Sequence, residues 1–301
     1  MTQTALSPRT WFELTLLALL WGGSFLSNLV ALDELGPLTI VALRVSLACA
    51  VLWAVVLFRG QHVPRGLRTW GAFAVMGLLN NAIPFSLYSW GQQFIPSGLT
   101  AIFNATTAIF GVLVAALVFA DERLTARRAL GVAIGFAGVL TAIGPAALLR
   151  LDLTSLAQLG AIAATFCYAL AGAWARHFLK GVSPVMAATG MLTCSSVMMI
   201  PVSLWAEGPP PLVLHPATWA AVLYYALIAT ALAYLLYYRV LAAAGSGNLL
   251  LVTLMIPPVA IALGAWLRNE TLPPQAYAGF ALLALGLAVL DGRLLRRRQR
   301  V

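Results

Sequence analysis

Residues 121–138, DERLTARRALGVAIGFAG, return near the end of the chain as residues 269–286, NETLPPQAYAGFALLALG. Each stretch carries a Glu-x-Leu followed by two glycines that lie seven residues apart. The match extends back over Thr69–Thr141 and Thr218–Val289. Upstream it pairs Trp70 with Trp219, Tyr88 with Tyr237, and Ser97-Gly98 with Ser246-Gly247, all 149 residues apart. Self-similarity at a fixed separation indicates a duplicated structural unit.

The composition is typical of an integral membrane protein. The chain has 301 residues, of which 61% are hydrophobic and 9% are charged, whereas a soluble domain carries about 25% charged residues. Several long apolar stretches are close to or above the ~20 residues that cross the hydrocarbon core of a bilayer. The predicted spans are Trp11–Ala31, Pro37–Phe58, Trp70–Ile95, Ser97–Ala120, Ala126–Pro145, Leu156–Ala175, Ser183–Trp205, Ala217–Leu241, Gly247–Leu267 and Pro274–Gly292.

Five of these spans fall in each copy, which predicts an all-α membrane protein of ten transmembrane helices. We expect the first five-helix repeat over residues 1–147 and the second over 148–301. Because five is odd, the second copy should enter the bilayer in the opposite orientation. An inverted repeat around a midplane site is an architecture of secondary transporters, since the two halves can exchange shapes and open the site to either side.

The net charge of +9 is better explained by membrane topology than by nucleic-acid binding. With a cytoplasmic N-terminus, all but three of the 18 basic residues lie on the cytoplasmic side, the exceptions being Arg44, Arg150 and Arg268. This asymmetry predicts both termini in the cytoplasm of a cell with an inner membrane. The basic run Arg293–Arg300 follows the last span, where such tails typically anchor topology and meet anionic membrane lipid. A nucleic-acid arm is the alternative.

Several classes of function lack the residues that they need. The single lysine, Lys180, has no Walker A glycine pattern around it, so ATP bound to this chain is not expected to power transport. Cys49, Cys167 and Cys194 lie in apolar spans, which favours small hydrophobic roles over disulfides or zinc. An intramembrane enzyme would need a His, Cys or carboxylate cluster at membrane depth, and the predicted spans show none. We therefore expect no enzyme activity, cofactor or metal.

The fifth and tenth spans are rich in glycine. Gly131-x-x-x-Gly135 with Gly138 marks the fifth, and Gly279 with Gly286 marks the tenth. Small faces of this kind let membrane helices approach closely. They could form a dimer contact or pack within one subunit. We favour packing within the subunit, and a monomer over a homodimer.

Together these features resemble the drug/metabolite transporter superfamily, in particular its ten-helix EamA type. The resemblance is carried by Trp21-Gly22-Gly23-Ser24-Phe25, by Leu43-Arg44-Val45 and by the two Glu-x-Leu…Gly…Gly segments. It runs over nearly the whole chain and is closest, in overall similarity, to bacterial amino-acid exporters. It implies a ten-helix bundle, a central cavity lined by all but the fifth and tenth helices, and export of small metabolites.

Away from the ends of the predicted spans, the one charged residue is Arg44. It lies about 10 Å down a helix from Pro37 at 1.5 Å per residue. Its guanidinium could anchor a substrate carboxylate or bond backbone carbonyls of a neighbouring helix, and both interpretations stay open. No Asp or Glu lies mid-span, and Glu13 sits near the cytoplasmic start of the first span. Since a proton-coupled site usually needs a buried carboxylate, strict dependence on a proton gradient is not expected.

Neutral polar and aromatic residues at mid-depth are the expected lining of the cavity. Amides and hydroxyls bind an ammonium or a carboxylate without carrying charge, and aromatic faces accept apolar groups and cations. The predicted substrate-binding residues are Trp21, Ser24, Asn28, Arg44, Asn80, Asn81, Tyr88, Asn104, Tyr168, Trp174, Tyr234 and Thr253. Pro84 and the pair Pro257-Pro258 break backbone hydrogen bonds inside spans, which predicts hinges or plain packing kinks.

The two copies differ where a site is expected. Pro257-Pro258 align with Ala108-Ile109, and when Pro37 is matched to Pro184, Arg44 aligns with Met191. The cavity should therefore be asymmetric. We predict a secondary transporter that exports small zwitterionic metabolites, amino acids foremost, by alternating access. A carrier of drugs, nucleotide sugars or lipid-linked sugars is one alternative, and a membrane sensor or scaffold without transport is another.

Overall fold

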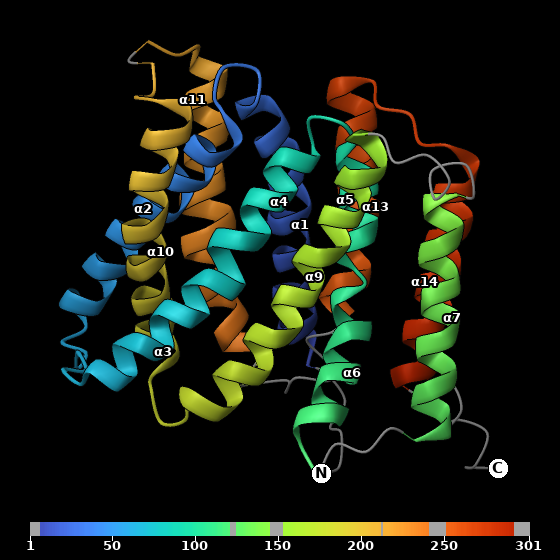
Figure 1. Cartoon of the computed structure of the whole chain (residues 1–301), viewed down its shortest axis with the longest axis horizontal. Helices are drawn as coiled ribbons and strands as arrows, with labels where there is room; N and C mark the ends of the chain where they lie inside the picture. The colour runs from blue at the N-terminus through green and yellow to red at the C-terminus, as the bar shows by residue number, and fades with distance from the viewer. Residues whose placement is uncertain (1–6, 121–124, 145–152, 212, 241–250, 292–301) are drawn as a thin grey trace.

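The computed structural model describes residues 7–120, 125–144, 153–211, 213–240 and 251–291. Within those ranges every regular element is helical, which confirms the all-α fold (Figure 1). The helices long and apolar enough to cross a membrane are Pro8–Ala31, Pro37–Phe58, Leu67–Gly91, Ser97–Val118, Ala126–Ile143, Leu153–Phe178, Pro184–Glu207 and Pro216–Val240. Two shorter apolar helices, Met255–Arg268 and Pro274–Val289, follow them. The protein is a multi-pass membrane protein.

Some spans are single helices and others are helices in series. The single ones are α1 (Pro8–Ala31), α2 (Pro37–Phe58), α7 (Ala126–Ile143), α9 (Leu153–Phe178), α10 (Pro184–Glu207), α13 (Leu251–Arg268) and α14 (Pro274–Asp291). The third span consists of α3 (Leu67–Gly77), η1 (Leu78–Ala82) and α4 (Ile83–Gly91) in series. The fourth consists of α5 (Ser97–Asn104) and α6 (Thr107–Val118). The eighth consists of α11 (Pro216–Leu223) and η2 (Tyr224–Leu232), followed by helical residues 233–240.

Several helices begin where the sequence supplies a cap or a proline. The hydroxyls of Ser7, Thr125 and Ser183 each accept a hydrogen bond from the backbone N–H three residues later, which satisfies a donor that has no partner within the helix. α2, α10 and α11 begin with a proline. Proline suits this position because its fixed φ matches the first turn and its missing N–H would have no helical partner there.

π-Helical turns occupy equivalent positions in the two copies. η1 interrupts the third span and η2 the eighth, and a shift of 149 residues carries residues 78–82 onto 227–231, inside η2. Pro84 lies two residues after the end of η1, and because proline has no N–H to close an α-helical turn, it gives η1 a local cause. η2 contains no proline. The duplication therefore extends from sequence to an uncommon backbone geometry.

The other predicted hinge lies in an unbroken helix. Pro257 and Pro258 are internal to α13, which continues through them. The interruption of the equivalent fourth span falls instead at Ala105-Thr106, between α5 and α6. The break in the fourth span thus has no counterpart in the continuous helix α13.

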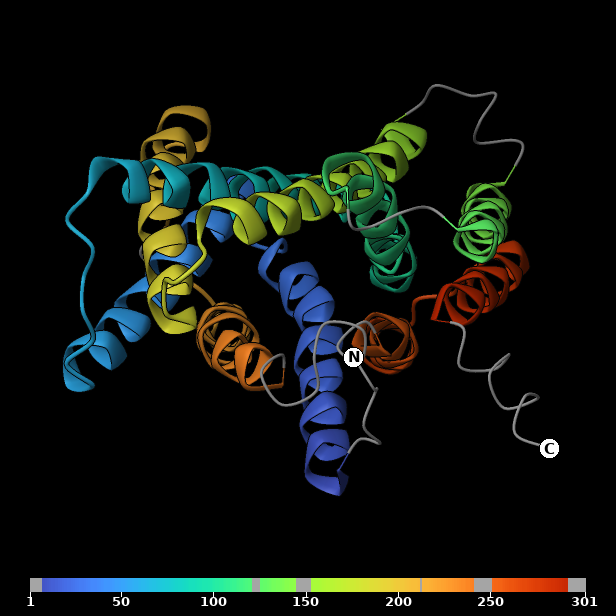
Figure 2. The ribbon, with the colours of Figure 1, turned by 90° about the horizontal axis from the view of Figure 1, so that it is seen from below.

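α7 and α14 lie side by side at one edge of the bundle, and both views show them apart from the remaining helices (Figures 1 and 2). A Cβ added to Gly279 would lie 2.5 Å from the backbone nitrogen of Ala142, and one added to Gly286 would lie 2.6 Å from that of Gly135. Only glycine permits so close an approach of the two backbones. The glycine faces of the fifth and tenth spans therefore pack against each other within the chain.

The two copies are also joined at one end of the bundle, which we call the Glu34 end because it carries the α1–α2 loop. Three carboxylates there each accept hydrogen bonds from the first turn of a helix in the other copy, where backbone N–H groups lack helical partners. Glu34 accepts hydrogen bonds from the His215 N–H at 2.9 Å and from the Thr218 hydroxyl. Glu207 accepts from the N–H groups of Leu38 and Thr39 at 2.9 and 2.8 Å. Glu270 accepts from the Ser97 N–H at 2.9 Å. Asp33 and Arg268 form an ion pair at 2.6 Å.

The opposite end, the Glu13 end, is joined by an ion pair. The Glu13 carboxylate on α1 lies 2.8 Å from Arg239, which follows η2 on the eighth span, and 3.2 Å from Arg9. Glu13 is buried although both arginines are exposed. It sits near the start of the first span as predicted, and its charge is balanced by two partners. Glu270 thus caps the start of α5 in the other copy, whereas Glu122 lies outside the described residues.

Candidate functional site

Arg44 is buried on α2 between the third and eighth spans, with 7% of its surface exposed. Its guanidinium carbon lies 3.5 Å from the centroid of the Phe85 ring and 3.9 Å from that of Tyr225. Its Nε donates a hydrogen bond to the Thr230 hydroxyl at 2.7 Å. Among the described residues no carboxylate pairs with it and no backbone carbonyl accepts from it. The positive charge is held by two ring faces and one hydroxyl.

Three predicted residues form a network beside this site. The Asn80 amide donates to the Tyr234 hydroxyl at 3.2 Å and to the Met191 sulfur at 3.5 Å. The Tyr234 hydroxyl donates to the Asn81 carbonyl oxygen at 2.9 Å, and the Asn81 amide donates to the Ser195 hydroxyl at 2.9 Å. Asn81 is fully buried, whereas Asn80 and Tyr234 are half-buried. The network joins the third, seventh and eighth spans with neutral polar groups.

A second group of predicted residues joins the first, third, fourth and sixth spans. The Tyr88 hydroxyl donates to the Asn104 side-chain oxygen at 3.1 Å. The Tyr88 ring lies 6.0 Å from Phe25 and 6.1 Å from Tyr168, between ring centroids. Tyr88 lies on α4, the same helix that carries Phe85 against Arg44, so α4 connects this group to the surroundings of Arg44.

The remaining predicted residues make contacts elsewhere in the described structure. The Ser24 hydroxyl donates to the Trp21 carbonyl at 2.6 Å, a bond within one turn of α1. The Asn28 amide donates to the Gln92 side chain at 2.7 Å, and the Trp174 indole donates to the Ala72 carbonyl at 3.1 Å. None of these bonds reaches Arg44.

Two further contacts complete this set. The Trp21 ring packs 5.8 Å from that of Tyr237, measured between centroids. Thr253 is half-buried on α13. Both residues lie in the half of the bundle that α1 and α13 share, so neither belongs to the surroundings of Arg44 that the described contacts define.

Sequence reasoning missed three residues that touch Arg44: Phe85, Tyr225 and Thr230. The duplication held a usable signal for two of them. A shift of 149 residues carries Asn81, which was predicted, onto Thr230, and it carries Phe85 onto Tyr234. Extending each predicted residue to its counterpart in the other copy would have added Thr230, and would have added Phe85 from Tyr234.

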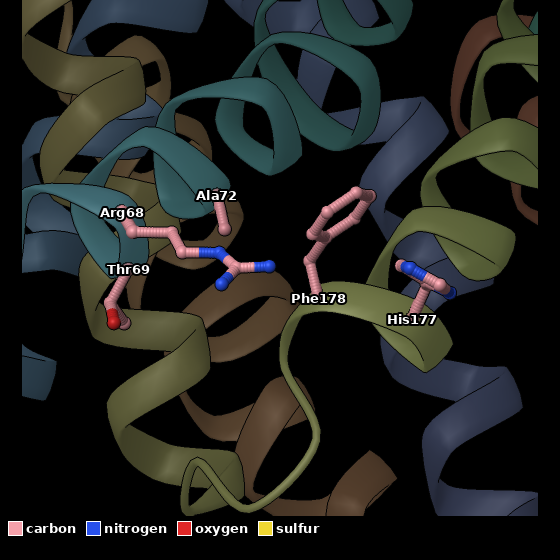
Figure 3. Close-up of a pocket in the computed structure, with 5 residues that line it drawn as sticks. All are labelled: Arg68, Thr69, Ala72, His177 and Phe178. Atoms are coloured by element: carbon pink, nitrogen blue, oxygen red, sulfur yellow. The ribbon is translucent and has the colours of Figure 1, made fainter.

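An open pocket of about 130 Å³ lies at the Glu13 end, away from Arg44. It is lined by Arg68, Thr69, Ala72, His177 and Phe178, and Figure 3 shows the Arg68 guanidinium directed toward the Phe178 ring. Most of these residues are exposed, and none is a predicted substrate-binding residue. We therefore do not assign this pocket to the substrate. In the described part of the chain, no group of three or more His, Cys, Asp and Glu could hold a metal ion.

At the Glu34 end one carboxylate has a perturbed ionisation. The hydrogen bond from the Thr218 hydroxyl, followed by that from the His215 N–H, lowers the pKa of Glu34 below its ordinary value. Both bonds are stronger to the ionised carboxylate than to the protonated form. Glu34 is therefore held as an anion where it meets the start of α11.

Comparison with known proteins places the chain among transporters. The EamA-like transporter family model matches twice, over residues 11–144 and 155–290, as a duplicated chain requires. A solved crystal structure is similar over 96% of this chain and 99% of its own, with a TM-score of 0.69 at 19% identity, which is a likeness of fold.

Three relatives match over nearly their whole length at low identity. An uncharacterized transporter, YvbV, of Bacillus subtilis is 23% identical, covering 94% of this chain and 92% of the relative. A probable terminal-alkyne amino-acid exporter of Streptantibioticus cattleyicolor is 26% identical, covering 98% and 97%. A probable amino-acid metabolite efflux pump of Salmonella typhimurium is 27% identical, covering 98% and 99%.

Proposed function

The chain belongs to the EamA-like transporter family, and from this premise we propose that it exports amino acids and related small zwitterionic metabolites. The observation that carries the proposal is Arg44, a buried cation without a carboxylate partner among the described residues. A charge at membrane depth is costly, and such residues usually serve function. A substrate carboxylate would supply the missing anion.

The chemistry around Arg44 suits a carboxylate better than a cation. A guanidinium is planar and can bind a carboxylate through two parallel N–H···O bonds. Its Nε is already bonded to Thr230, so a ligand would be bound by the terminal nitrogens. The neighbouring Asn80 and Tyr234 are neutral donors and acceptors and are only half-buried. They can meet the uncharged or ammonium part of a zwitterion without adding net charge.

The relatives support this substrate class without defining it, because two of them are described as amino-acid exporters and another as uncharacterized. A carrier of drugs or nucleotide sugars is the second candidate. Such substrates are larger, and a phosphate-bearing substrate would be expected to need more than one buried cation, whereas the middle of the predicted spans offers Arg44 alone.

The placement in the cell is part of the same proposal. We propose an inner-membrane monomer with both termini in the cytoplasm, built from inverted repeats over 1–147 and 148–301. In that orientation the Glu34 end faces outward and the Glu13 end faces the cytoplasm. Alternating access then requires the contacts between the copies to break in turn, those of Glu34, Glu207 and Glu270 at one end and Glu13–Arg239 at the other.

The test is flux through the purified protein in liposomes, comparing a labelled amino acid with its carboxamide. Arg44→Ala should lower transport of the acid at least tenfold, and Arg44→Lys, which keeps the charge but loses the planar fork, should retain an intermediate rate. Arg176→Ala is the matched control, because it removes an arginine stacked on Phe119 at 4.1 Å at the exposed end of α9.

Three outcomes would count against the proposal. Equal rates for the acid and the amide would remove the carboxylate anchor. Equal loss of thermal stability and transport in Arg44→Ala and Arg44→Lys would make Arg44 structural. Absence of flux for any solute of a broad panel would favour a sensor or scaffold.

A further inference from the structure

Two of the residues that contact Arg44 are five positions apart on the eighth span. Tyr225 places its ring over the guanidinium, and Thr230 accepts from its Nε. In an α-helix each residue turns by about 100°, so residues five apart point in directions that differ by roughly 140°. One arginine could not then contact both in this way.

The π-helical geometry of η2 removes this conflict. A π-helix closes its hydrogen bonds between residues i and i+5, which stacks residues five apart on the same face. Tyr225 and Thr230 both lie within η2. The Thr230 hydroxyl donates to the Tyr225 carbonyl at 2.8 Å, a bond across five residues. The extra residue in the turn therefore brings the ring and the hydroxyl to one face of the span.

The same bond orients the Thr230 hydroxyl toward Arg44. A hydroxyl has a single proton, and here the proton is directed to the Tyr225 carbonyl. Its oxygen lone pairs then face the Nε of Arg44, which lies at 2.7 Å. The guanidinium carbon lies over the Phe85 and Tyr225 rings, 3.5 and 3.9 Å from their centroids. Because Nε is bonded to Thr230, the terminal nitrogens are the donors with which the guanidinium would meet a ligand.

The first copy has the same arrangement of a π turn bonded to a facing helix, but without a charged residue. η1 is also π-helical, Asn81 is the counterpart of Thr230, and Asn81 likewise bonds a residue of the facing helix, Ser195 on α10. When Pro37 is matched to Pro184, the counterpart of Arg44 is Met191, which accepts from Asn80. Each π turn thus faces the second helix of the other copy, and one of the two crossings carries a cation.

We propose that Thr230 is a positioning residue for substrate, held by the η2 turn so that its hydroxyl aims the terminal nitrogens of Arg44 at a substrate carboxylate. This inference rests on the proposed function and names a residue that acts through Arg44. Thr230 need not touch the substrate. Its effect should therefore be specific to substrates that carry the carboxylate.

The experiment compares liposome uptake of a labelled amino acid and its carboxamide by Thr230→Val, which keeps the side-chain shape and loses the acceptor. Hydrogen bonds to charged groups are among the stronger ones, so we expect the KM for the acid to rise about tenfold or more, with the maximal rate little changed and amide transport unaffected. Thr230→Ser should restore the wild-type KM. In an Arg44→Gln background Thr230→Val should have no further effect.

The matched control is Thr189→Val on α10. Thr189 is fully buried and donates to the carbonyl four residues earlier at 2.8 Å, without contact to Arg44. It should leave the KM for both solutes unchanged. Should Thr230→Val not yield folded protein, Thr230→Ala gives the same loss of the acceptor.

The proposal fails if Thr230→Val leaves the KM for the acid unchanged, if it affects acid and amide alike, or if its effect persists in the Arg44→Gln background. These results are separable from failure of the proposed function. In the first case Arg44→Ala would still lower transport of the acid, whereas failure of the function would leave that variant without effect as well.

Discussion

The contact between α7 and α14 makes a sharp quantitative prediction. Gly279→Ala would place a Cβ 2.5 Å from the Ala142 nitrogen and 2.6 Å from the Gly138 carbonyl oxygen. Gly286→Ala would place one 2.6 Å from the Gly135 nitrogen and 2.7 Å from the carbonyl oxygen of Gly131. The obstacles are backbone atoms, which cannot rotate away as a side chain could. The two helices must therefore move apart.

The size of that movement sets the expected loss. Ordinary contact of a Cβ begins near 3.4 Å, so a contact of 2.5 Å requires a separation of about 0.9 Å. A gap of 0.5–1 Å forfeits roughly a quarter to a half of the dispersion energy of each atom pair. Packing is the main attraction between helices in lipid, where no hydrophobic effect drives them together. Overpacking of this kind typically destabilises by about 1–3 kcal/mol, and we expect that range for each variant.

The assay is thermal unfolding of the purified protein in detergent or nanodiscs, where about 1 kcal/mol corresponds to a shift of roughly 2–4 °C. The matched control is Gly172→Ala on α9, where an added Cβ would have no atom within 4 Å. Since alanine is favoured over glycine in a helix by about 0.5–1 kcal/mol, the control should be neutral or stabilising. Melting temperatures for Gly279→Ala and Gly286→Ala equal to that of Gly172→Ala would refute the reasoning.

Three further predictions follow from the charged residues. Uptake into liposomes should not need a pH gradient, since no mid-span carboxylate is present; uptake that requires the gradient and vanishes in Glu13→Gln would contradict this. The pKa of Glu34 is lowered in the folded protein, so its contact with Thr218 stabilises the fold fully above the ordinary Glu pKa of about 4.3. This stabilisation is lost as the pH falls through the lower folded-state pKa, and the stability difference between wild type and Glu34→Gln should therefore disappear in acid. A difference that is constant with pH would argue against this reasoning. A cysteine introduced within residues 293–301 should resist impermeant reagents on intact cells, and strong labelling would overturn the proposed topology.

The sequence carries the architecture because membrane helices and their contacts leave local signals. Length and apolarity alone identify a span. Glycines at repeated spacing identify the close pair of α7 and α14, since backbone approach depends on which residues lack a Cβ. The cap that Glu270 provides leaves no such signal, because its partner, Ser97, lies in the other copy.

The surroundings of Arg44 illustrate what pattern alone does not supply. η2 has no proline or glycine to indicate a π turn, and the bond between its Thr230 and Arg44 is a tertiary contact. An α-helical reading of the eighth span turns Tyr225 and Thr230 to different faces. Both were therefore left out of the predicted site, whereas Tyr234 and Asn80, placed by depth alone, prove to be bonded to each other.

The asymmetry between Arg44 and Met191 bears on how transport could be driven. A ligand shifts an equilibrium between two states only by the difference in its affinity for them, and moving the balance from 1:99 to 99:1 takes about 5.5 kcal/mol. At the Glu34 end, the helix-start contacts of Glu207 and Glu270 contribute about 0.3–1 kcal/mol each, and the exposed Asp33–Arg268 pair about 0.2–1 kcal/mol. These polar contacts therefore oppose the opening of that end by only a few kcal/mol.

A single charge-assisted pair at Arg44 is of that order. Arg44 lies where η2 packs against α2, and Met191 lies where η1 packs against α10. A bound carboxylate therefore interacts with the two halves unequally. Movement of η2 against α2 would change the interaction energy of the bound carboxylate with Arg44. The same movement of η1 against α10 would change that energy little. An exporter driven by the gradient of its own substrate needs no ion to supply that difference. The crossing of η2 and α2 is therefore where we expect binding to be coupled to opening.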